Sequence, residues 1–341
     1  MPVITPQNPR QVAQAITLKD VQDAMARVKG RITNTPVFTS THMNTVTGFD
    51  LIFKHEGMNK TGSFKCRGAS NALAMLTDEQ AAKGVVTHSS GNFAQALAWA
   101  SQHARNEPIN AYVCMPDNAP LSKREAAAGY NGIISICPST IEGREAAAEK
   151  VRQETGAEFI HAAHDTRVMA GQGTMALEIL EAHPDIQAIV VPVGGGGLIS
   201  GVAVAIKGMN SNIKVIGAEP EITDEAARSL QLGSLQKNTD YSDTVADGLR
   251  VAIGDKTFSC INNCVDAIVT VPEQDIIDAC FTVFHRMKVV IEPSAGVGVA
   301  AVLKQNDAIR VKLGLERDAK VAVILCGSNI DMMNKPLPWL K

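Results

Sequence analysis

The segment Lys60-Thr61-Gly62-Ser63-Phe64-Lys65 lies between residues 52–56, which are predicted to form a β-strand, and residues 66–76, whose apolar side chains recur at helical spacing. A lysine at such a strand-to-helix junction can reach into a cleft. If burial there removes water from the ammonium group, its pKa falls and the amine becomes a nucleophile. Lys65 is therefore a candidate for Schiff-base attachment of an aldehyde cofactor. Taken alone, the segment is more typical of a surface lysine that begins an ordinary helix.

Short apolar strands alternate with helices along most of the chain. In the first half, strands are predicted at residues 85–88, 111–115 and 133–136, with helices at 91–104, 122–128 and 141–154. After residue 173, further strands are predicted at 188–192, 215–217, 267–271 and 321–325. Such alternation is typical of parallel sheets with right-handed crossover helices. We therefore expect an α/β protein with two open parallel-sheet domains, in which residues 81–158 form a smaller domain inserted between residues 1–80 and 159–341 of a larger one.

The composition excludes several classes of protein. The 341 residues carry a formal net charge of −3, aromatic side chains make up only 4% of the chain, and lysine and arginine are scattered, so nucleic-acid binding is not supported. No apolar run has the length of a membrane span, and residues 1–10 lack the apolar core of a signal peptide. The seven cysteines include no Cys-x-x-Cys pair, so we expect reduced thiols and a cytoplasmic protein.

The strongest local motif is Pro192-Val193-Gly194-Gly195-Gly196-Gly197-Leu198, which follows a predicted buried strand and precedes a predicted helix. Glycine lets a backbone approach a ligand closely, and the free N–H groups at a helix start favour an anion, usually a phosphate. The motif is not a dinucleotide fingerprint, because Ile199 and Ser200 stand where a third glycine is needed. The tetraglycine loop (residues 194–197) therefore indicates a site for a monophosphate cofactor, with a tight structural turn as the alternative.

Two further polar segments follow predicted strands. His88-Ser89-Ser90-Gly91-Asn92 leads into a helix, and Cys326-Gly327-Ser328-Asn329 follows a fully apolar strand. Ligands of open α/β sheets bind at the carboxyl ends of the strands. The first segment suits a carboxylate and the second suits a ring nitrogen, although helix capping and a simple turn explain them equally well when each is taken alone.

An acidic loop follows another predicted strand, with Glu219, Glu221, Asp224 and Glu225 close together. A loop that supplies carboxylates and carbonyl groups suits a hard divalent cation. From spacing alone, a solvated acidic loop without a metal is the more common arrangement.

The chain carries four motifs in a fixed order: Lys-Thr-Gly-Ser-Phe-Lys-x-Arg-Gly-Ala from Lys60, Ser-Ser-Gly-Asn from Ser89, the tetraglycine loop, and Cys-Gly-Ser-Asn from Cys326. This combination resembles the fold-type II pyridoxal phosphate enzymes of the serine/threonine dehydratase group, and within that group most closely the eukaryotic-type serine racemases. Residues 170–174 and 291–301 add to the resemblance, which spans roughly residues 15–335. It implies a tryptophan synthase β-like fold with pyridoxal 5'-phosphate in the cleft between two α/β domains.

The resemblance implies a role for each matching residue. Lys65 would hold the cofactor as a Schiff base and act as a base on one face of the substrate, with Ser90 as acid and base on the opposite face. The other cofactor contacts would be Phe64 along the ring, Asn92 at the phenolic oxygen, Gly194, Gly195, Gly196 and Gly197 at the phosphate, and Cys326 at the pyridine nitrogen. The substrate carboxylate would be bound by Ser89, Ser90, Asn92 and Arg144. A divalent cation, magnesium or calcium, would be bound by Glu219, the carbonyl of Thr223, and Glu225.

The implied activity is the interconversion of L- and D-serine, together with β-elimination of serine to pyruvate and ammonia. Phe93 and Ala94 replace the histidine and the glycine that are usual after the asparagine, so threonine or 3-hydroxyaspartate dehydratase activity and aspartate racemase activity are alternatives on the same scaffold. The resemblance also implies a homodimer and leaves a nucleotide effector open as a further partner. A nicotinamide-dependent oxidoreductase and a non-catalytic ligand-binding protein are the competing classes, and neither needs a reactive Lys65.

Overall fold

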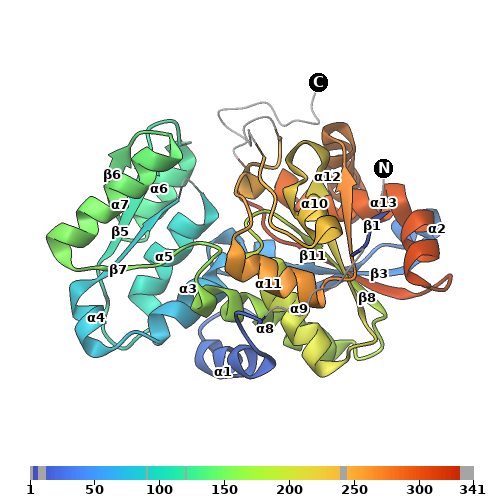
Figure 1. Ribbon diagram of the computed structural model, residues 1–341, viewed down its shortest axis with the longest axis horizontal. Coiled ribbons are helices and arrows are strands. Elements are labelled where there is room, and N and C mark those ends of the chain that lie inside the picture. The colour runs from blue at the N-terminus through green and yellow to red at the C-terminus, as the bar shows by residue number, and fades with distance from the viewer. Residues whose placement is uncertain (1–2, 7–12, 90, 120, 239–243, 331–341) are drawn as a thin grey trace.

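A computed structural model describes residues 3–6, 13–89, 91–119, 121–238 and 244–330. Within these residues the strands form two sheets, the smaller on the left of Figure 1 and the larger on the right. The larger sheet has seven strands in the order β1-β10-β9-β8-β11-β3-β2, and the smaller has four in the order β6-β5-β4-β7. The predicted α/β fold with two open, mainly parallel sheets is therefore confirmed.

The larger sheet has a parallel centre and antiparallel edges. Its parallel strands are β10 (Ala267–Val271), β9 (Lys214–Pro220), β8 (Ala188–Pro192), β11 (Lys320–Leu325) and β3 (Asp50–His55). The edge strands β1 (Val3–Ile4) and β2 (Val37–Thr39) run antiparallel to their neighbours. The central strands are almost wholly buried, because helices cover both faces of a parallel sheet, and this explains their continuous apolar sequences.

The smaller sheet is entirely parallel. Its strands are β4 (Val85–His88), β5 (Ala111–Pro116), β6 (Ile133–Cys137) and β7 (Glu158–Phe159). The helices beside it are α4 (Asp78–Lys83), α5 (Asn92–His103), α6 (Leu121–Gly129) and α7 (Ile141–Thr155). The boundary predicted after residue 158 divides β7, although both residues of β7 pair with β4. The smaller unit therefore extends at least to Phe159, and its other limits stay a prediction.

The remaining helices surround the larger sheet or connect it to the smaller one. They are α1 (Leu18–Val28), α2 (Thr41–Thr47), α3 (Lys65–Ala74), α8 (Thr166–Ala182), α9 (Gly197–Met209), α10 (Glu225–Leu232), α11 (Asp255–Cys264), α12 (Glu273–Met287) and α13 (Pro293–Leu313). Short 3-10 turns occur at η1 (Glu56–Met58), η2 (Lys60–Gly62), η3 (Glu221–Thr223) and η4 (Asp247–Leu249). Over the described part of the chain, no helix combines the length and apolar character needed to cross a membrane. All seven cysteines are buried free thiols, so the expected absence of disulfides agrees with the structure.

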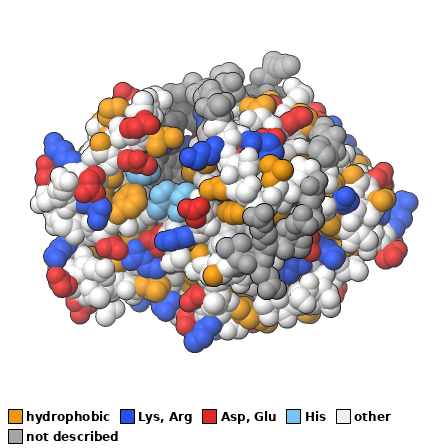
Figure 2. Space-filling model, viewed as in Figure 1, with side chains coloured by type: hydrophobic (Ala, Val, Ile, Leu, Met, Phe, Trp, Pro, Cys, Tyr) orange, Lys and Arg blue, Asp and Glu red, His pale blue; other side chains and the backbone are white. Residues whose placement is uncertain are grey.

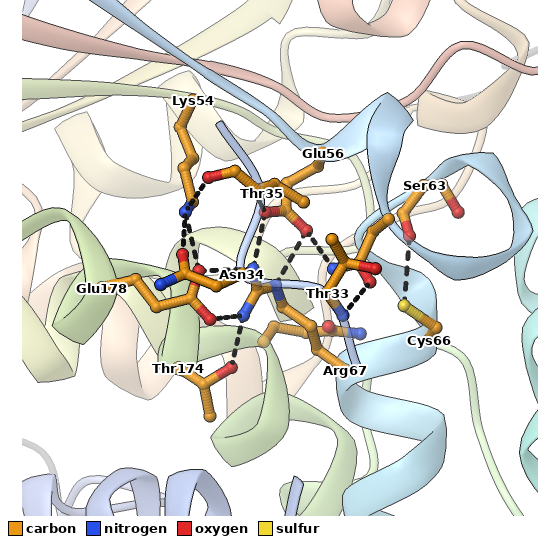
Figure 3. A network of polar contacts seen from close by, with 12 residues as sticks. Thr33, Asn34, Thr35, Lys54, Glu56, Ser63, Cys66, Arg67, Thr174 and Glu178 are labelled. Atoms are coloured by element: carbon orange, nitrogen blue, oxygen red, sulfur yellow. Dashed lines mark hydrogen bonds and ion pairs between the residues drawn. The ribbon is translucent and has the colours of Figure 1, made fainter. Parts of the chain in front are cut away.

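A buried network of charges holds α3, whose first residue is Lys65, against β3 and α8 (Figure 3). The Arg67 guanidinium makes two ion pairs, at 2.8 Å from its Nε to Glu56 Oε2 and at 2.7 Å from its Nη1 to Glu178 Oε1. Lys54 Nζ lies 2.7 Å from Glu178 Oε2, so two cations and two anions balance. Burial alone would raise the pKa of the Glu56 carboxyl, but the charge and hydrogen bonds of Arg67 hold it below its usual value. The network therefore fixes the start of α3 through fully paired charges.

Replacing Arg67 with methionine is expected to lower the free energy of unfolding by about 3–5 kcal/mol, because it leaves two buried carboxylates without their shared partner. Arg152→Met is the matched control, since its ion pair with Glu149 has both side chains 49% exposed and such pairs contribute only about 0–1 kcal/mol. Chemical denaturation followed by circular dichroism measures both variants. If both variants lost the same small amount of unfolding free energy, the Arg67 network would not stabilise the fold.

Candidate active site

A cavity of about 780 Å³ lies where the carboxyl ends of β4, β8 and β11 meet the starts of α3, α5, α9 and α13. It is lined by every described residue that the sequence assigned to the cofactor or the substrate: Phe64, Lys65, Ser89, Asn92, Arg144, Gly194, Gly195, Gly196, Gly197 and Cys326. Ser90 lies outside the described residues. These side chains come from segments up to 262 residues apart (Phe64 to Cys326), so the fold brings four separate sequence motifs to one place.

Lys65 is partly buried at the first position of α3, with its Nζ among apolar side chains. Nζ donates a hydrogen bond to the Ala162 carbonyl at 3.2 Å and lies 4.9 Å from the centre of the Phe64 ring and 5.9 Å from that of Phe93. Burial lowers the pKa of the Lys65 amine to about 8, although the neighbouring Cys326 and Glu292 act in the opposite direction. About one amine in ten is then neutral at pH 7. Lys65 therefore has the chemistry of a nucleophile and a base.

The tetraglycine loop ends β8 and begins α9, and it is too closely packed to hold side chains. A Cβ added to Gly194 would lie 2.8 Å from Leu249 Cα, and one added to Gly197 would lie 2.8 Å from the Ala163 carbonyl oxygen. Gly196 has φ of +79°, a backbone conformation that favours glycine. The glycines at the start of α9 line the cavity, and the first N–H groups of a helix have no partner within the helix, which is an arrangement that favours a phosphate.

Asn92 is held by two residues from the side of the larger sheet. Its Nδ2 donates to Glu292 Oε1 at 2.8 Å and to Oε2 at 3.0 Å, while Asn329 Nδ2 donates to Asn92 Oδ1 at 2.9 Å. Burial, followed by the charge of Asp247, raises the pKa of the Glu292 carboxyl to about 7. In the sequence, Glu292 belongs to a segment that adds to the family resemblance, but Glu292 was not predicted as a site residue. Its position directly before Pro293, at the start of a buried helix, is the signal that indicates it.

Cys326 follows directly after β11, lines the cavity and is 2% exposed. Its carbonyl accepts a hydrogen bond from the Phe64 N–H at 3.1 Å, which ties the Cys326 segment to the lysine segment. Burial and the nearby charge of Glu292 raise the pKa of the Cys326 thiol well above its usual value. The side chain is therefore a neutral thiol, which is a weak hydrogen-bonding partner.

Ser89 and Arg144 reach the cavity from the smaller sheet. The Ser89 N–H donates to the Cys114 carbonyl at 3.1 Å, and Ser89 Oγ accepts from the Gly91 N–H at 3.4 Å. Arg144 Nε donates to the Thr140 carbonyl at 3.4 Å, and within the described residues the guanidinium forms no ion pair. Arg144 is therefore free to meet a carboxylate that enters the cavity.

The predicted cation ligands are buried rather than solvated, which corrects the expectation that a loop of this spacing is usually a solvated acidic one. Glu219 and Glu225 are each 1% exposed and Thr223 is 2% exposed. Glu219 accepts the N–H groups of Ala226 at 3.1 Å and Ala227 at 2.9 Å. Burial and mutual repulsion raise the pKa of Glu219, and burial raises the pKa of Glu225 to about 7. Among the described residues, no three His, Cys, Asp or Glu side chains form a metal-binding group, so a cation here would need carbonyl ligands.

Charged side chains of both signs are intermixed on the face shown in Figure 2, and histidines gather near its middle. Over the described part of this face there is no continuous basic patch, in agreement with the scattered lysine and arginine of the sequence.

The site combines, in one cavity of an α/β fold, a lysine with a lowered pKa and a glycine loop at the start of a helix. The chain belongs to the pyridoxal-phosphate dependent enzymes, and the model of that family matches residues 28–327. The lysine with its lowered pKa, the glycine loop that a Cβ would fill and the thiol at the end of β11 all fit this cofactor. The predicted fold type and the predicted cofactor are confirmed, and a nicotinamide-dependent or non-catalytic class is not supported.

Relatives with named activities resemble the chain over nearly its whole length. It is 42% identical to the serine racemase of Dictyostelium discoideum over 318 residues, which is 93% of this chain and 96% of the relative. It is 41% identical to the β-hydroxyaspartate dehydratase of Paracoccus denitrificans over 323 residues, which is 95% of this chain and 98% of the relative.

Solved structures agree with this relationship. Maize serine racemase superimposes with a TM-score of 0.89 at 40% identity, over 93% of this chain and 95% of that one. A pyridoxal 5'-phosphate-dependent aspartate racemase superimposes with a TM-score of 0.87 at 37% identity, over 96% of this chain and 99% of that one.

Proposed function

We propose that this chain racemises serine and also eliminates water from it, giving pyruvate and ammonia. The observation that carries the proposal is the common cavity of Lys65, Ser89 and Asn92 in a chain that resembles serine racemases over more than nine-tenths of its length. Both reactions begin with removal of the same Cα proton. The cavity supplies an amine for that step and hydroxyl and amide groups for the substrate carboxylate.

The residues proposed to hold pyridoxal 5'-phosphate are those that line the cavity. Lys65 would bind the aldehyde carbon, the tetraglycine loop would bind the phosphate, Phe64 would contact the ring, Asn92 would contact the phenolic oxygen, and Cys326 would contact the pyridine nitrogen; all of them line the cavity. When bound, the cofactor supplies an electron sink that stabilises negative charge at the substrate Cα. A neutral thiol does not hold a proton on the pyridine nitrogen as a carboxylate would, so this sink is a moderate one.

Lys65 and Ser90 are proposed to move the Cα proton on opposite faces. The lowered pKa of Lys65 lets its neutral amine accept a proton near neutral pH. Ser89, Ser90 and Asn92 bind and orient the carboxylate, and the unpaired guanidinium of Arg144 provides a second contact. Racemisation returns the proton from the other face, whereas elimination expels the β-hydroxyl.

Dehydration of threonine or 3-hydroxyaspartate, and racemisation of aspartate, are the second set of candidate activities. Phe93 favours them, because it stands where the racemases usually carry histidine and its buried ring lines the cavity beside Lys65. Chiral product analysis after incubation of the holoenzyme with L-serine, L-threonine, 3-hydroxyaspartate and aspartate tests both sets. D-serine and pyruvate from L-serine support the first proposal, whereas turnover confined to the dicarboxylic substrates supports the second.

A divalent cation is proposed at Glu219, the carbonyl of Thr223, and Glu225. Burial raises the pKa of both carboxyls, and the charge of Glu225 adds to the rise at Glu219, so a cation that neutralises them would stabilise the pair. Oxygen ligands of this kind suit magnesium or calcium.

Glu219→Gln is expected to abolish stabilisation by magnesium or calcium. At a metal concentration 100 times its dissociation constant, wild-type protein should melt about 4 °C higher than in chelator. Thermal denaturation with and without chelator measures the difference, and Glu221→Gln is the control because Glu221 is exposed in the same loop. No response of the wild type to the chelator would count against a metal at this loop.

A cytoplasmic homodimer with a nucleotide effector is proposed on the family resemblance. Exposed aromatic side chains support a subunit contact, since Phe281 and Phe284 lie three residues apart on α12 and are 45% and 46% exposed. Sedimentation of the holoenzyme with and without ATP tests the subunit count and the effector together.

A further inference from the structure

Lys123 is a buried cation whose ion pair joins the two sides of the cavity. It lies on α6, beside the smaller sheet, and is only 8% exposed. Its ammonium forms an ion pair with Asp247 of η4, on the side of the larger sheet, and both residues line the cavity. Because a buried ammonium loses its hydration, such a side chain is retained only where nearby anions compensate for that loss. The pair therefore ties the two sides of the site together.

The ammonium also lies against the segment proposed to bind the substrate carboxylate. A Cβ added to Gly91 would be 3.5 Å from Lys123 Nζ, and Gly91 stands between the Ser89 and Asn92 regions of that segment. Asn92 is in turn bound by Glu292 from the larger-sheet side. The Lys123–Asp247 ion pair and the Asn92–Glu292 hydrogen bonds are thus two links between the two sides of the cavity.

The charges around Lys123 come from several elements. Burial lowers the pKa of Lys123, but Asp247 and Glu292 together raise it above its usual value, with Arg250 opposing them. Asp247 raises the pKa of Glu292, whereas Lys123 lowers it. Lys123 is consequently a cation that offsets part of the rise in the pKa of Glu292.

We propose that Lys123 is a positioning residue: its ion pair with Asp247 holds the smaller-sheet side of the cavity, which includes Asn92, close to the larger-sheet side, and so keeps the cavity shaped for the substrate carboxylate. The inference rests on the proposed function for the identity of the substrate. It assigns no chemical step to Lys123. Loss of the ion pair is therefore expected to weaken binding of the substrate more than it slows the chemical step.

Kinetics of the holoenzyme separate this role from simple packing. Lys123→Met, which keeps the length and removes the charge, should raise KM for L-serine about 10-fold or more with a smaller change in kcat. Lys123→Arg should recover most of the loss, because the charge is restored. Lys207→Met is the control, since Lys207 forms a 2.7 Å ion pair with Asp266 away from the cavity.

The pH dependence of kcat/KM gives a readout that loss of packing does not predict. Both Glu292 oxygens accept from Asn92, which requires the ionised carboxylate, so activity should fall as the pH drops through the Glu292 pKa. Removing Lys123 raises that pKa and should move the acid limb to higher pH. Asp247→Asn lowers it and should move the limb to lower pH. Shifts of opposite sign support the proposal, and shifts of the same sign contradict it.

Hydrogen exchange of the ligand-free holoenzyme, measured by mass spectrometry, tests the closure without relying on any substrate. Residues 91–97 and 244–250 should exchange faster in Lys123→Met and Asp247→Asn than in wild type and Lys207→Met. If the wild type does not turn over serine, the proposed function fails while this comparison still decides the role of Lys123. Unchanged exchange in both cavity variants, or a KM within twofold of wild type, would overturn the proposal. Should Lys123→Met not fold, Asp247→Asn tests the same ion pair.

Discussion

Replacing Lys65 with alanine is expected to abolish covalent attachment of pyridoxal phosphate and all turnover. The amine lies in the cavity with a pKa lowered to about 8 by burial, and its neutral form is the nucleophile that the aldehyde needs. The same amine is the proposed base for the Cα proton, so one substitution removes two functions. Loss of a base alone costs roughly 10²–10⁴-fold in rate, and loss of attachment adds to it.

The measurement is borohydride reduction, which makes the lysine–aldehyde linkage permanent, followed by mass spectrometry of the peptides. Wild-type protein should carry the cofactor on the peptide containing residue 65, and the variant should carry none. Lys60→Ala is the control, because Lys60 is exposed five positions earlier in the same motif. A variant that retains both attachment and turnover would place the reactive lysine elsewhere and end the proposed mechanism.

Ser90→Ala is expected to separate racemisation from elimination. Racemisation needs a proton carrier on each face of the reacting carbon, and Lys65 serves only one face. The variant should lose conversion of L- to D-serine and action on D-serine, by roughly 10²–10⁴-fold. It should keep much of its elimination of L-serine, because that reaction uses the Lys65 face alone.

Ser89→Ala provides the matched control for this experiment. Ser89 lines the cavity and is proposed to bind the carboxylate of either enantiomer, so its loss should weaken both reactions together. Solvent deuterium incorporation and chiral product analysis from each enantiomer measure the two activities. If Ser90 only caps α5, the variant should lose about 1 kcal/mol of stability and keep the ratio of the activities. D-serine turnover at the wild-type rate would remove the racemase assignment and leave a dehydratase.

Much of the fold could be predicted because the buried strands of a parallel sheet have a recognisable sequence pattern. Residues 188–192 and 267–271 were predicted as strands with the bounds that the structure has, since both are continuous apolar runs covered on both faces. The sequence pattern also predicts a helix over residues 294–303; in the structure this helix, α13, begins at Pro293 and continues to Leu313, ten residues further. Its polar second half carries little apolar periodicity, so pattern alone ended it too early.

The sequence by itself determined the fold class and predicted residues that line one cavity. Lys65, Asn92, the tetraglycine loop and Cys326 each lie at a strand end or a helix start, and such ends converge in a parallel sheet. Only the tertiary structure decided which charges are buried and paired. The partnership of Lys123 with Asp247 joins residues 124 apart, and that of Asn92 with Glu292 joins residues 200 apart. No local pattern encodes such pairs. Desolvation and charge–charge interaction depend on the packed neighbours of each group, and those neighbours exist only after the chain has folded.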